Sequence, residues 1–222
     1  MAEATAPDGV VLAAGGSGRM GRPKALLEIA GETFLAHAIR VLREGGCRSV
    51  YVVTGEGPEL HAIVTAQDAV LVRNDDPASE QFTSVKLGMR ALPADSAAVA
   101  VLPVDCPLVQ PSTMQTLAAA AARTTKPVVL PMYNGVGGHP VVLMRSFYDT
   151  VLGARNAEGL SGVIIAHGHK VELVTVMDAG ILVDIDTPQE YERFIAGTAF
   201  GSGSGSGTEP GGGSANTNED SA

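Results

Sequence analysis

The sequence has little of what several protein classes require. Its 222 residues include only two cysteines, Cys47 and Cys106, which are too few for a disulfide framework and lack the spacing of metal ligands. The longest apolar runs are strand-sized, far short of the ~20 residues that a membrane-spanning helix needs. The formal net charge is −9 and Lys and Arg form no block, so binding to nucleic acid or to an anionic membrane is disfavoured.

The composition otherwise suits a globular domain, with 45% apolar and 18% charged residues. The segment Met1–Gly9 contains Glu3 and Asp8 but no basic residue, which is unlike a signal peptide, so we expect a cytoplasmic protein. We expect a single domain over residues 1–200. Residues 201–222 are rich in Gly and Ser and lack large aliphatic side chains, which predicts a disordered tail.

Strand-like and helix-like segments alternate along the chain. Strands are expected at Val10–Ala14, Ser49–Thr54, Val70–Val72, Ala98–Leu102, Pro127–Leu130, His139–Met144, Val171–Met177 and Ile181–Asp184. Helices are expected at Phe34–Leu42, Pro58–Ala66, Thr83–Leu92, Pro111–Arg123, Ser146–Gly153, Gly159–His167 and from Pro188 to about Ala196. This alternation predicts a three-layer α/β fold, with a mostly parallel, Rossmann-like sheet and helices on both faces. Ligands of such sheets bind beyond the carboxyl ends of the strands.

A glycine-rich, cationic loop follows the first expected strand. It reads Gly-Gly-Ser-Gly-Arg-Met-Gly-Arg-Pro-Lys from Gly15 to Lys24. Glycines let backbone N–H groups approach phosphate oxygens closely, and Arg19, Arg22 and Lys24 make the loop locally positive in an acidic protein. The loop therefore predicts a site for a polyphosphate, with a solvated turn as the plain alternative.

Two known phosphate-binding motifs fit this loop poorly. Gly16 to Gly21 has the spacing G-x-G-x-x-G of dinucleotide sites, which leaves an NAD(P)H- or flavin-linked oxidoreductase as an alternative. That motif needs a helix that begins within it, yet Pro23 follows and no helical pattern starts before Thr33. A Walker loop fails because Lys24 follows a proline and precedes no Ser or Thr.

The segment Leu12–Leu27, LAAGGSGRMGRPKALL, resembles the signature loop of the nucleotidyltransferases that act on molybdenum cofactor. It is more similar to the cytidylyltransferase branch, because the guanylyltransferase branch usually carries Leu-Ala-Gly-Gly and Asp-Lys there. Further motifs follow in the order of that family, over roughly residues 9–196: Asn74 with Phe82–Lys86, Val104–Pro107, Leu130–Pro140 and Asp184–Pro188. The resemblance implies a fold like that of the nucleotide-diphospho-sugar transferases.

The resemblance also implies roles for the residues of the nucleotide side. Arg19 and Lys24 would neutralise the β- and γ-phosphates and the transition state, and both would be catalytic. Asn74 and Ser84 would recognise the base or ribose, although a polar residue after a strand is equally a turn former. The nucleotide would further contact Leu12, Ala13, Ala14, Gly15, Gly16, Ser17, Gly18 and Asp105.

Acidic residues follow two of the expected strands. A carboxylate that faces phosphates needs a cation between them, so Asp105 predicts a Mg²⁺ site and a catalytic role, with capping of the Pro107 turn as the alternative. Strand alternation would place Asp184 and Asp186 on the same face. By resemblance Asp186 would be the second metal ligand and Asp184 structural, or Asp186 would instead help Thr187 to cap the last helix.

Gly138-His139-Pro140 begins an expected strand where the resemblance places the acceptor wall. His139 would donate to an anionic group of the acceptor, or would satisfy a turn. Two places depart from the family: Glu80 stands where relatives often have Gly, and Ala154–Gly162 stands where many relatives have a Gly-Asp-x-Gly-Ala-Arg-like sequence.

Together these motifs predict a Mg²⁺-dependent transfer of CMP from CTP to molybdopterin, with release of pyrophosphate and with a molybdoenzyme as partner. The alternatives are another phosphorylated acceptor, the oxidoreductase named above, and a non-catalytic chaperone of molybdenum cofactor.

Overall fold

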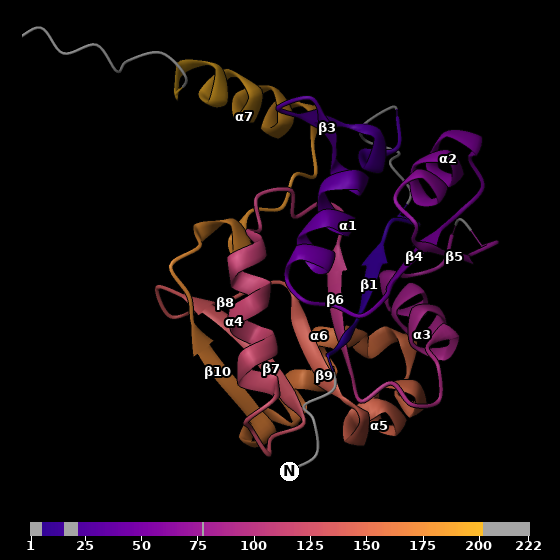
Figure 1. Cartoon of the computed structure of the whole chain (residues 1–222), viewed down its shortest axis with the longest axis vertical. Helices are drawn as coiled ribbons and strands as arrows, with labels where there is room; N and C mark the ends of the chain where they lie inside the picture. Colours follow the sequence, from indigo (N-terminus) through magenta and orange to yellow (C-terminus); the bar gives the residue numbers. More distant parts are fainter. Residues whose placement is uncertain (1–5, 16–21, 77, 202–222) are drawn as a thin grey trace, which may run out of the picture.

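The computed structural model describes residues 6–15, 22–76 and 78–201 of the chain (Figure 1). Its central feature is an eight-stranded sheet. The strands are β1 (Asp8–Leu12), β4 (Val50–Thr54), β5 (Val70–Arg73), β6 (Ala98–Pro103), β7 (Val128–Tyr133), β8 (Val136–Gly137), β9 (Val141–Met144) and β10 (Val171–Thr175). Their order is β10-β7-β9-β6-β1-β4-β5, with β8 paired to β7. The pairs that involve β9 or β8 are antiparallel and the others are parallel, which confirms the predicted, mostly parallel sheet.

Helices cover both faces of this sheet, which confirms the three-layer architecture (Figure 1). One face carries α1 (Phe34–Glu44), α2 (Pro58–Ala66) and α4 (Pro111–Ala121), and the other carries α3 (Gln81–Ala91), α5 (Tyr148–Gly153) and α6 (Gly159–Ala166). The two-sided burial explains the apolar sequence of β1. Val11 packs in the same cluster as Phe34 of α1, whereas its neighbours Val10 and Leu12 pack on the opposite face with Phe82 of α3.

The last helix, α7 (Pro188–Gly201), begins with a capping box. The backbone N–H of Glu190 donates to Thr187 Oγ1 at 3.3 Å, and the N–H of Thr187 donates to Glu190 Oε2 at 2.8 Å. The helix continues to Gly201, beyond the end near Ala196 that we expected.

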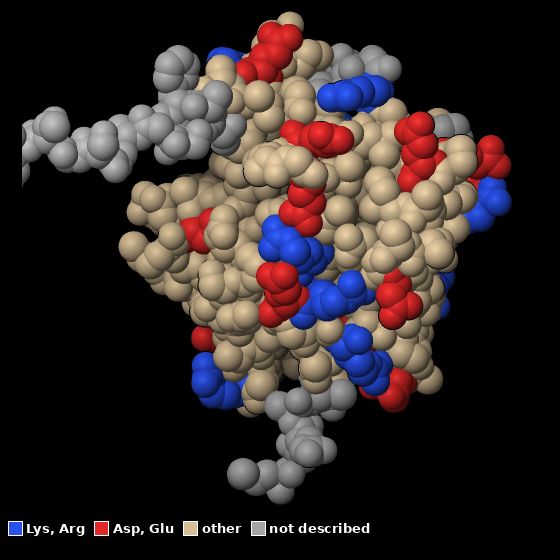
Figure 2. Space-filling view, turned by 45° about the horizontal axis from the view of Figure 1, so that its top comes forward, with Lys and Arg blue, Asp and Glu red and all other residues tan. Residues whose placement is uncertain are grey.

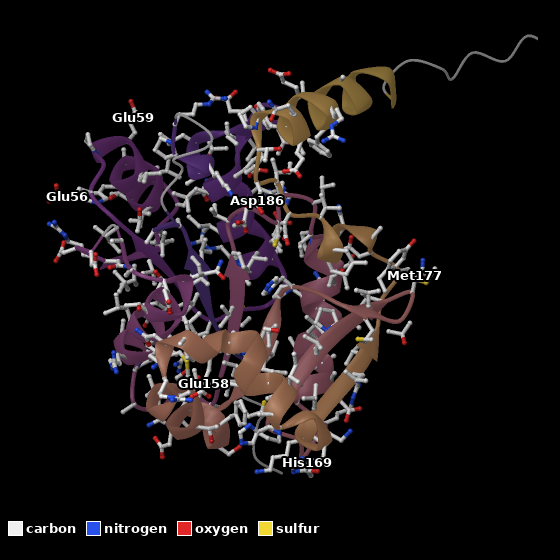
Figure 3. The ribbon with its side chains drawn as sticks, turned by 180° about the vertical axis from the view of Figure 1, so that it is seen from behind. Glu56, Glu59, Glu158, His169, Met177 and Asp186 are labelled. Carbon is white, nitrogen blue, oxygen red and sulfur yellow. The ribbon has the colours of Figure 1, made fainter. Side chains whose placement is uncertain are left out.

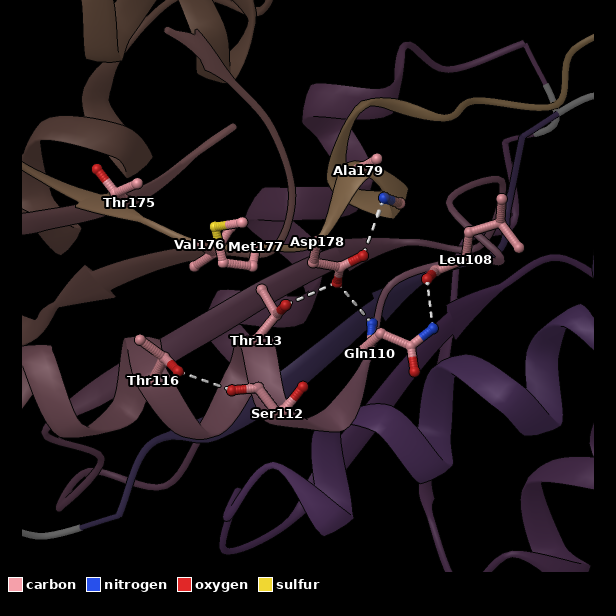
Figure 4. A pocket seen from close by; sticks show the side chains of 11 residues that line it. Leu108, Gln110, Ser112, Thr113, Thr116, Thr175, Val176, Met177, Asp178 and Ala179 are labelled. Carbon is pink, nitrogen blue, oxygen red and sulfur yellow. Dashed lines mark hydrogen bonds between the residues drawn. The ribbon is translucent and has the colours of Figure 1, made fainter. Parts of the chain in front are cut away.

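The strand predicted at Ile181–Asp184 is wrong, because Ala179–Leu182 forms a 3-10 helix, η5. The N–H of Gly180 donates to Asp178 Oδ1 at 2.9 Å and so caps this helix. The other oxygen of Asp178 accepts a hydrogen bond of 2.6 Å from Thr113 Oγ1, so one carboxylate ties η5 to the first turn of α4 (Figure 4). Local capping thus decides a segment whose apolar residues alone are typical of a strand.

Three short strands leave no signal in the sequence. β2 (Glu28–Ile29) and β3 (Glu32–Thr33) form a separate hairpin, and β8 pairs with the end of β7. Each has two residues, which are too few for a period-2 pattern. The hairpin turns through Ala30 and Gly31, both at positive φ.

Several charged side chains of the described residues form ion pairs. Arg40 lies 2.8 Å from Glu32, which fastens the β2–β3 hairpin to α1, and Arg48 lies 2.9 Å from both Asp8 and Asp95. On the face in Figure 2, Lys and Arg are interspersed with Asp and Glu. A search of the described helices for a span both long and apolar enough to cross a membrane finds none.

The carboxyl ends of β1, β4, β5 and β6 meet at one edge of the sheet. Backbone hydrogen bonds continue the ladder beyond the strands: Val104 N–H donates to the carbonyl of Leu12 at 3.1 Å, and Asn74 N–H to that of Thr54 at 2.9 Å. The residues that follow these strands are therefore held beside one another, where the sequence predicts the site.

Candidate active site

A small pocket of about 100 Å³, here called the loop pocket, lies beyond the end of β1. Its lining comprises Leu12, Ala13, Ala14, Gly15, Pro23, Lys24, Ala25, Gln81, Ser84, Val104 and Asp105. Most of the residues that we expected to bind a nucleotide thus share one cavity. Gly16, Ser17, Gly18 and Arg19 lie outside the described residues.

The Lys24 ammonium connects two acidic segments at this pocket. Its Nζ lies 3.4 Å from Asp105 Oδ2 and also donates to the carboxylate of Asp186, which lies between the sheet and α7 (Figure 3). Pro23 precedes the 3-10 turn Lys24–Leu26, and buried Ala25 anchors the turn in the core. This turn fixes the backbone of Lys24. The Lys24 side chain lines the loop pocket and is 17% exposed.

Asp105 occupies a half-buried turn directly after β6. Burial raises the pKa of its carboxyl, the nearby Lys24 ammonium opposes that shift, and the Asp184 carboxylate adds to it. The backbone carbonyl of Asp105 accepts a hydrogen bond of 3.0 Å from Ile185 N–H, which fixes the segment of Asp184 against the turn. A cation beside these two carboxylates would relieve their repulsion.

Asp184 joins the site in a way that the sequence did not predict. Ligand atoms of Asp105, Cys106 and Asp184 lie within 4.8 Å of one another. The buried Cys106 thiol donates to Asp184 Oδ1 at 3.0 Å, and burial next to that carboxylate raises the pKa of the thiol. The strand alternation that was expected to place Asp184 and Asp186 on one face is absent from this segment.

Asn74 and Ser84 contact each other behind the pocket. Asn74 Nδ2 donates to Ser84 Oγ at 3.0 Å and to Ser79 Oγ at 2.7 Å, and its Oδ1 accepts from Asp76 N–H at 3.2 Å. Asn74 therefore organises the turn after β5, which is the structural alternative that its position allowed. Ser84 lines the loop pocket itself.

A larger cavity of about 690 Å³, here called the apolar pocket, adjoins the loop pocket and shares Leu12 and Gln81 with it. Leu130, Val136, Leu160, Ile164 and Ile181 are among its apolar lining residues, and His139 and Asp184 are among its polar ones. A mostly apolar cavity with a few polar groups is typical of a site for a small organic molecule. Its lining residue Gln81, at the first turn of α3, is a contact that sequence reasoning missed.

His139 lies in this wall, two residues before β9, which starts at Val141 and not at His139 as expected. Its Nδ1 is buried without a hydrogen-bond partner among the described residues, and burial lowers the pKa of the imidazole. The backbone N–H of His139 donates to the carbonyl of Ile181 at 3.1 Å. Gly138 makes this approach possible, because a Cβ there would lie 2.1 Å from the same carbonyl oxygen.

The sequence of this chain matches a known family. The model of the MobA-like NTP transferase domain matches residues 9–171. This chain belongs to the MobA-like NTP transferase family. The MobA-like chain is 27% identical to the molybdenum cofactor cytidylyltransferase of Escherichia coli K12, over 84% of this chain and 94% of the relative. It is 31% identical to the molybdenum cofactor guanylyltransferase of Xanthomonas euvesicatoria pv. vesicatoria, over 84% and 93%.

The fold has solved counterparts. A nucleotidyl transferase from Methanothermobacter thermautotroptrophicus superposes on this MobA-like chain with a TM-score of 0.73 at 22% identity, over 89% of this chain and 99% of that one. The protein is thus a nucleotidyltransferase with a Rossmann-like fold.

Proposed function

We propose that this MobA-like transferase transfers CMP from CTP to the terminal phosphate of molybdopterin and releases pyrophosphate. The observation that carries the proposal is that Lys24 and Asp105 lie 3.4 Å apart in the loop pocket, which adjoins the apolar pocket. The loop pocket suits nucleotide phosphates, and the apolar pocket suits a flat heterocycle such as a pterin.

The choice of CTP over GTP rests on the loop sequence. Ala13-Ala14-Gly15 and Pro23-Lys24 follow the cytidylyltransferase pattern rather than the guanylyltransferase one.

The residues of the loop pocket would act by positioning and by charge. A phosphate oxygen of the acceptor attacks the α-phosphorus of CTP in line, a new P–O bond forms, and the bond to pyrophosphate breaks with its electron pair. Backbone amides of residues 15–18 would bind the phosphates, and Arg19 and Lys24 would neutralise the leaving pyrophosphate. Of these groups, Lys24 is already placed by the turn that follows Pro23.

Mg²⁺ fits the donors at this edge, since Asp105 and Asp184 offer neighbouring carboxylate oxygens and Asp186 shares Lys24 with Asp105. Asp105 would be one ligand of the ion and Asp186 the other, with Asp184 as the alternative to Asp186. When bound, the ion would supply positive charge to the phosphates. His139 would contact the anionic group of the acceptor.

The proposed reaction also implies a partner protein. A product that is a cofactor needs a recipient, so a molybdoenzyme would be the partner. The composition supports a catalytic domain over residues 1–200, a Gly/Ser-rich tail over 201–222 and a cytoplasmic location.

A panel of CTP, GTP, ATP and UTP with Mg²⁺ and molybdopterin tests the proposal through pyrophosphate release and product mass. We expect release with CTP and a product that carries CMP. Release with GTP alone contradicts the nucleotide, and a product formed only with another phosphorylated compound contradicts the acceptor. CTP binding without turnover would indicate a chaperone, and saturable NADPH or flavin binding without Mg²⁺ would indicate an oxidoreductase.

A further inference from the structure

A buried lysine outside the loop pocket holds the segment between α5 and α6. Lys86 lies on α3 and is 7% exposed. Its Nζ donates to the carbonyl of Ala154 and, at 3.0 Å, to Asn156 Oδ1, and it lies 4.7 Å from the ring centroid of Phe82. These partners are neutral, and the Glu158 carboxyl lies nearby, its pKa lowered by Arg155 and, to a smaller extent, by the Lys86 charge.

Asn156 completes the attachment. Its Nδ2 donates to Thr83 Oγ1 at 2.9 Å. The Asn156 side chain therefore contacts both Thr83 and Lys86, which lie three residues apart on one side of α3. Glu158, labelled in Figure 3, closes the same segment by accepting from Arg155 N–H at 3.2 Å. The segment Ala154–Glu158 is therefore fastened to α3 by side-chain contacts from Lys86 and Thr83.

The attached segment leads directly into a wall of the apolar pocket. Gly159, Leu160 and Ser161 form the first turn of α6 and line that pocket, as Gln81 and Val85 of α3 do. The distance between α3 and the start of α6 consequently sets the width of the pocket on this side.

Packing alone does not require a lysine at this place. Burying an ammonium whose hydrogen-bond partners are neutral costs desolvation free energy, which an apolar side chain of similar length would avoid. A lysine is suited to holding the segment instead, because its ammonium donates to both the Ala154 carbonyl and Asn156 Oδ1.

We propose that Lys86 is a positioning residue for the acceptor: it holds Ala154–Glu158 and the start of α6 against α3, and so shapes the pocket that would receive the acceptor. The inference rests on the proposed function, because it concerns the acceptor of that reaction. It assigns acceptor selectivity to the segment in which this chain departs from the resembling family.

Three variants test it: Lys86→Met removes both the attachment and the charge, Asn156→Ala removes one attachment only, and Arg90→Met removes an exposed charge from the same helix as a control. We expect Lys86→Met to raise the KM for molybdopterin by about tenfold or more and Asn156→Ala by about threefold. The KM for CTP should change less than about twofold in all three. Hydrogen exchange of the amides of residues 154–161 should accelerate in the first two variants only.

Equal changes of both KM values, or an unchanged KM for molybdopterin in Lys86→Met, would overturn the proposal. If Lys86→Met does not fold, Asn156→Ala decides by the same two measurements. A wild-type protein that transfers no CMP to molybdopterin contradicts the proposed function, whereas unchanged exchange of residues 154–161 in both variants contradicts the attachment itself.

Discussion

The two halves of the sheet build their sides of the site by different means. In the first half, β1, β4, β5 and β6 are parallel neighbours, and the loop pocket lies where β1 and β6 end. In the second half, β9 runs antiparallel, and the apolar pocket is walled by η5 and by the start of α6. Regular topology thus positions the phosphate side, whereas close backbone packing and single side-chain contacts position the acceptor side.

If the strand ends carry the chemistry, changing Asp105 should have the largest effect. We expect Asp105→Asn to lower kcat by about 1,000-fold, or about 4 kcal/mol, because a metal ligand facing the phosphates is lost. Stability should not fall, since burial and the Asp184 carboxylate already disfavour the ionised side chain. Pyrophosphate release and circular dichroism measure the two quantities.

The matched control is Asp178→Asn in the second half of the chain. It weakens the cap that joins η5 to α4, so it should cost about 1 kcal/mol of stability and leave kcat unchanged. A wild-type rate in Asp105→Asn would show that this carboxylate has no catalytic role. It would also contradict the contrast between the two halves of the sheet.

Lys24→Ala should have the next largest effect, a loss of about 100-fold in kcat/KM for CTP. Without the ammonium, the carboxylates of Asp105 and Asp186 face the phosphates with less compensation. Lys126→Ala is the control, because Lys126 makes a comparable ion pair of 3.2 Å with Glu172 at the far edge of the sheet. Equal losses of kcat/KM in both variants would show a general effect of removing a positive charge, and would contradict a specific role of Lys24 in nucleotide binding.

The first half of the chain could be predicted well because its signals are local. Helix α2 matches its predicted bounds, and β1 was recognised from a short apolar run that ends at glycines. Because the carboxyl ends of neighbouring parallel strands meet at one edge, pairing β6 with β1 is enough to bring Asp105 close to the loop that follows β1. The resemblance then supplied roles for residues whose proximity the structure shows, such as Lys24 and Asp105.

The second half was predicted less well because long-range contacts decide it. No local pattern shows that Asp178 caps two elements, and this capping replaces the strand expected at Ile181–Asp184. Alternation along a strand would have placed Asp184 and Asp186 on one face, and without that strand the expectation does not apply. The attachment of Lys86 to Asn156 joins residues 70 positions apart, so sequence spacing gives no sign of it.

A pair of glycine variants sharpens the comparison at the level of stability. A Cβ on Gly138 would lie 2.1 Å from the Ile181 carbonyl oxygen, so Gly138→Ala should cost about 1–3 kcal/mol of unfolding free energy. A Cβ on Gly15 meets no described atom within 4 Å, so Gly15→Ala should change stability by less than about 0.5 kcal/mol. Urea denaturation measures both.

The same pair should separate the two substrates. Gly15→Ala should raise the KM for CTP, since the added methyl group enters the loop pocket. Gly138→Ala should raise the KM for the acceptor. Equal destabilisation by the two substitutions would show that backbone packing is no tighter on the acceptor side.

The smallest expected effect concerns acid sensitivity in the first half. Hydrogen bonds from Arg40 lower the pKa of Glu32, so the folded state binds a proton more weakly there than the unfolded state does. The pair therefore stabilises the fold above the unfolded pKa near 4.5 and loses this contribution as the pH falls through the lower folded pKa. Because both side chains are partly exposed, we expect only a few tenths of a kcal/mol. Glu32→Gln should thus be less stable than wild type at pH 7 and equally stable near pH 3 in urea denaturation, and a difference that persists at the lower pH would assign it to packing of the β2–β3 hairpin instead.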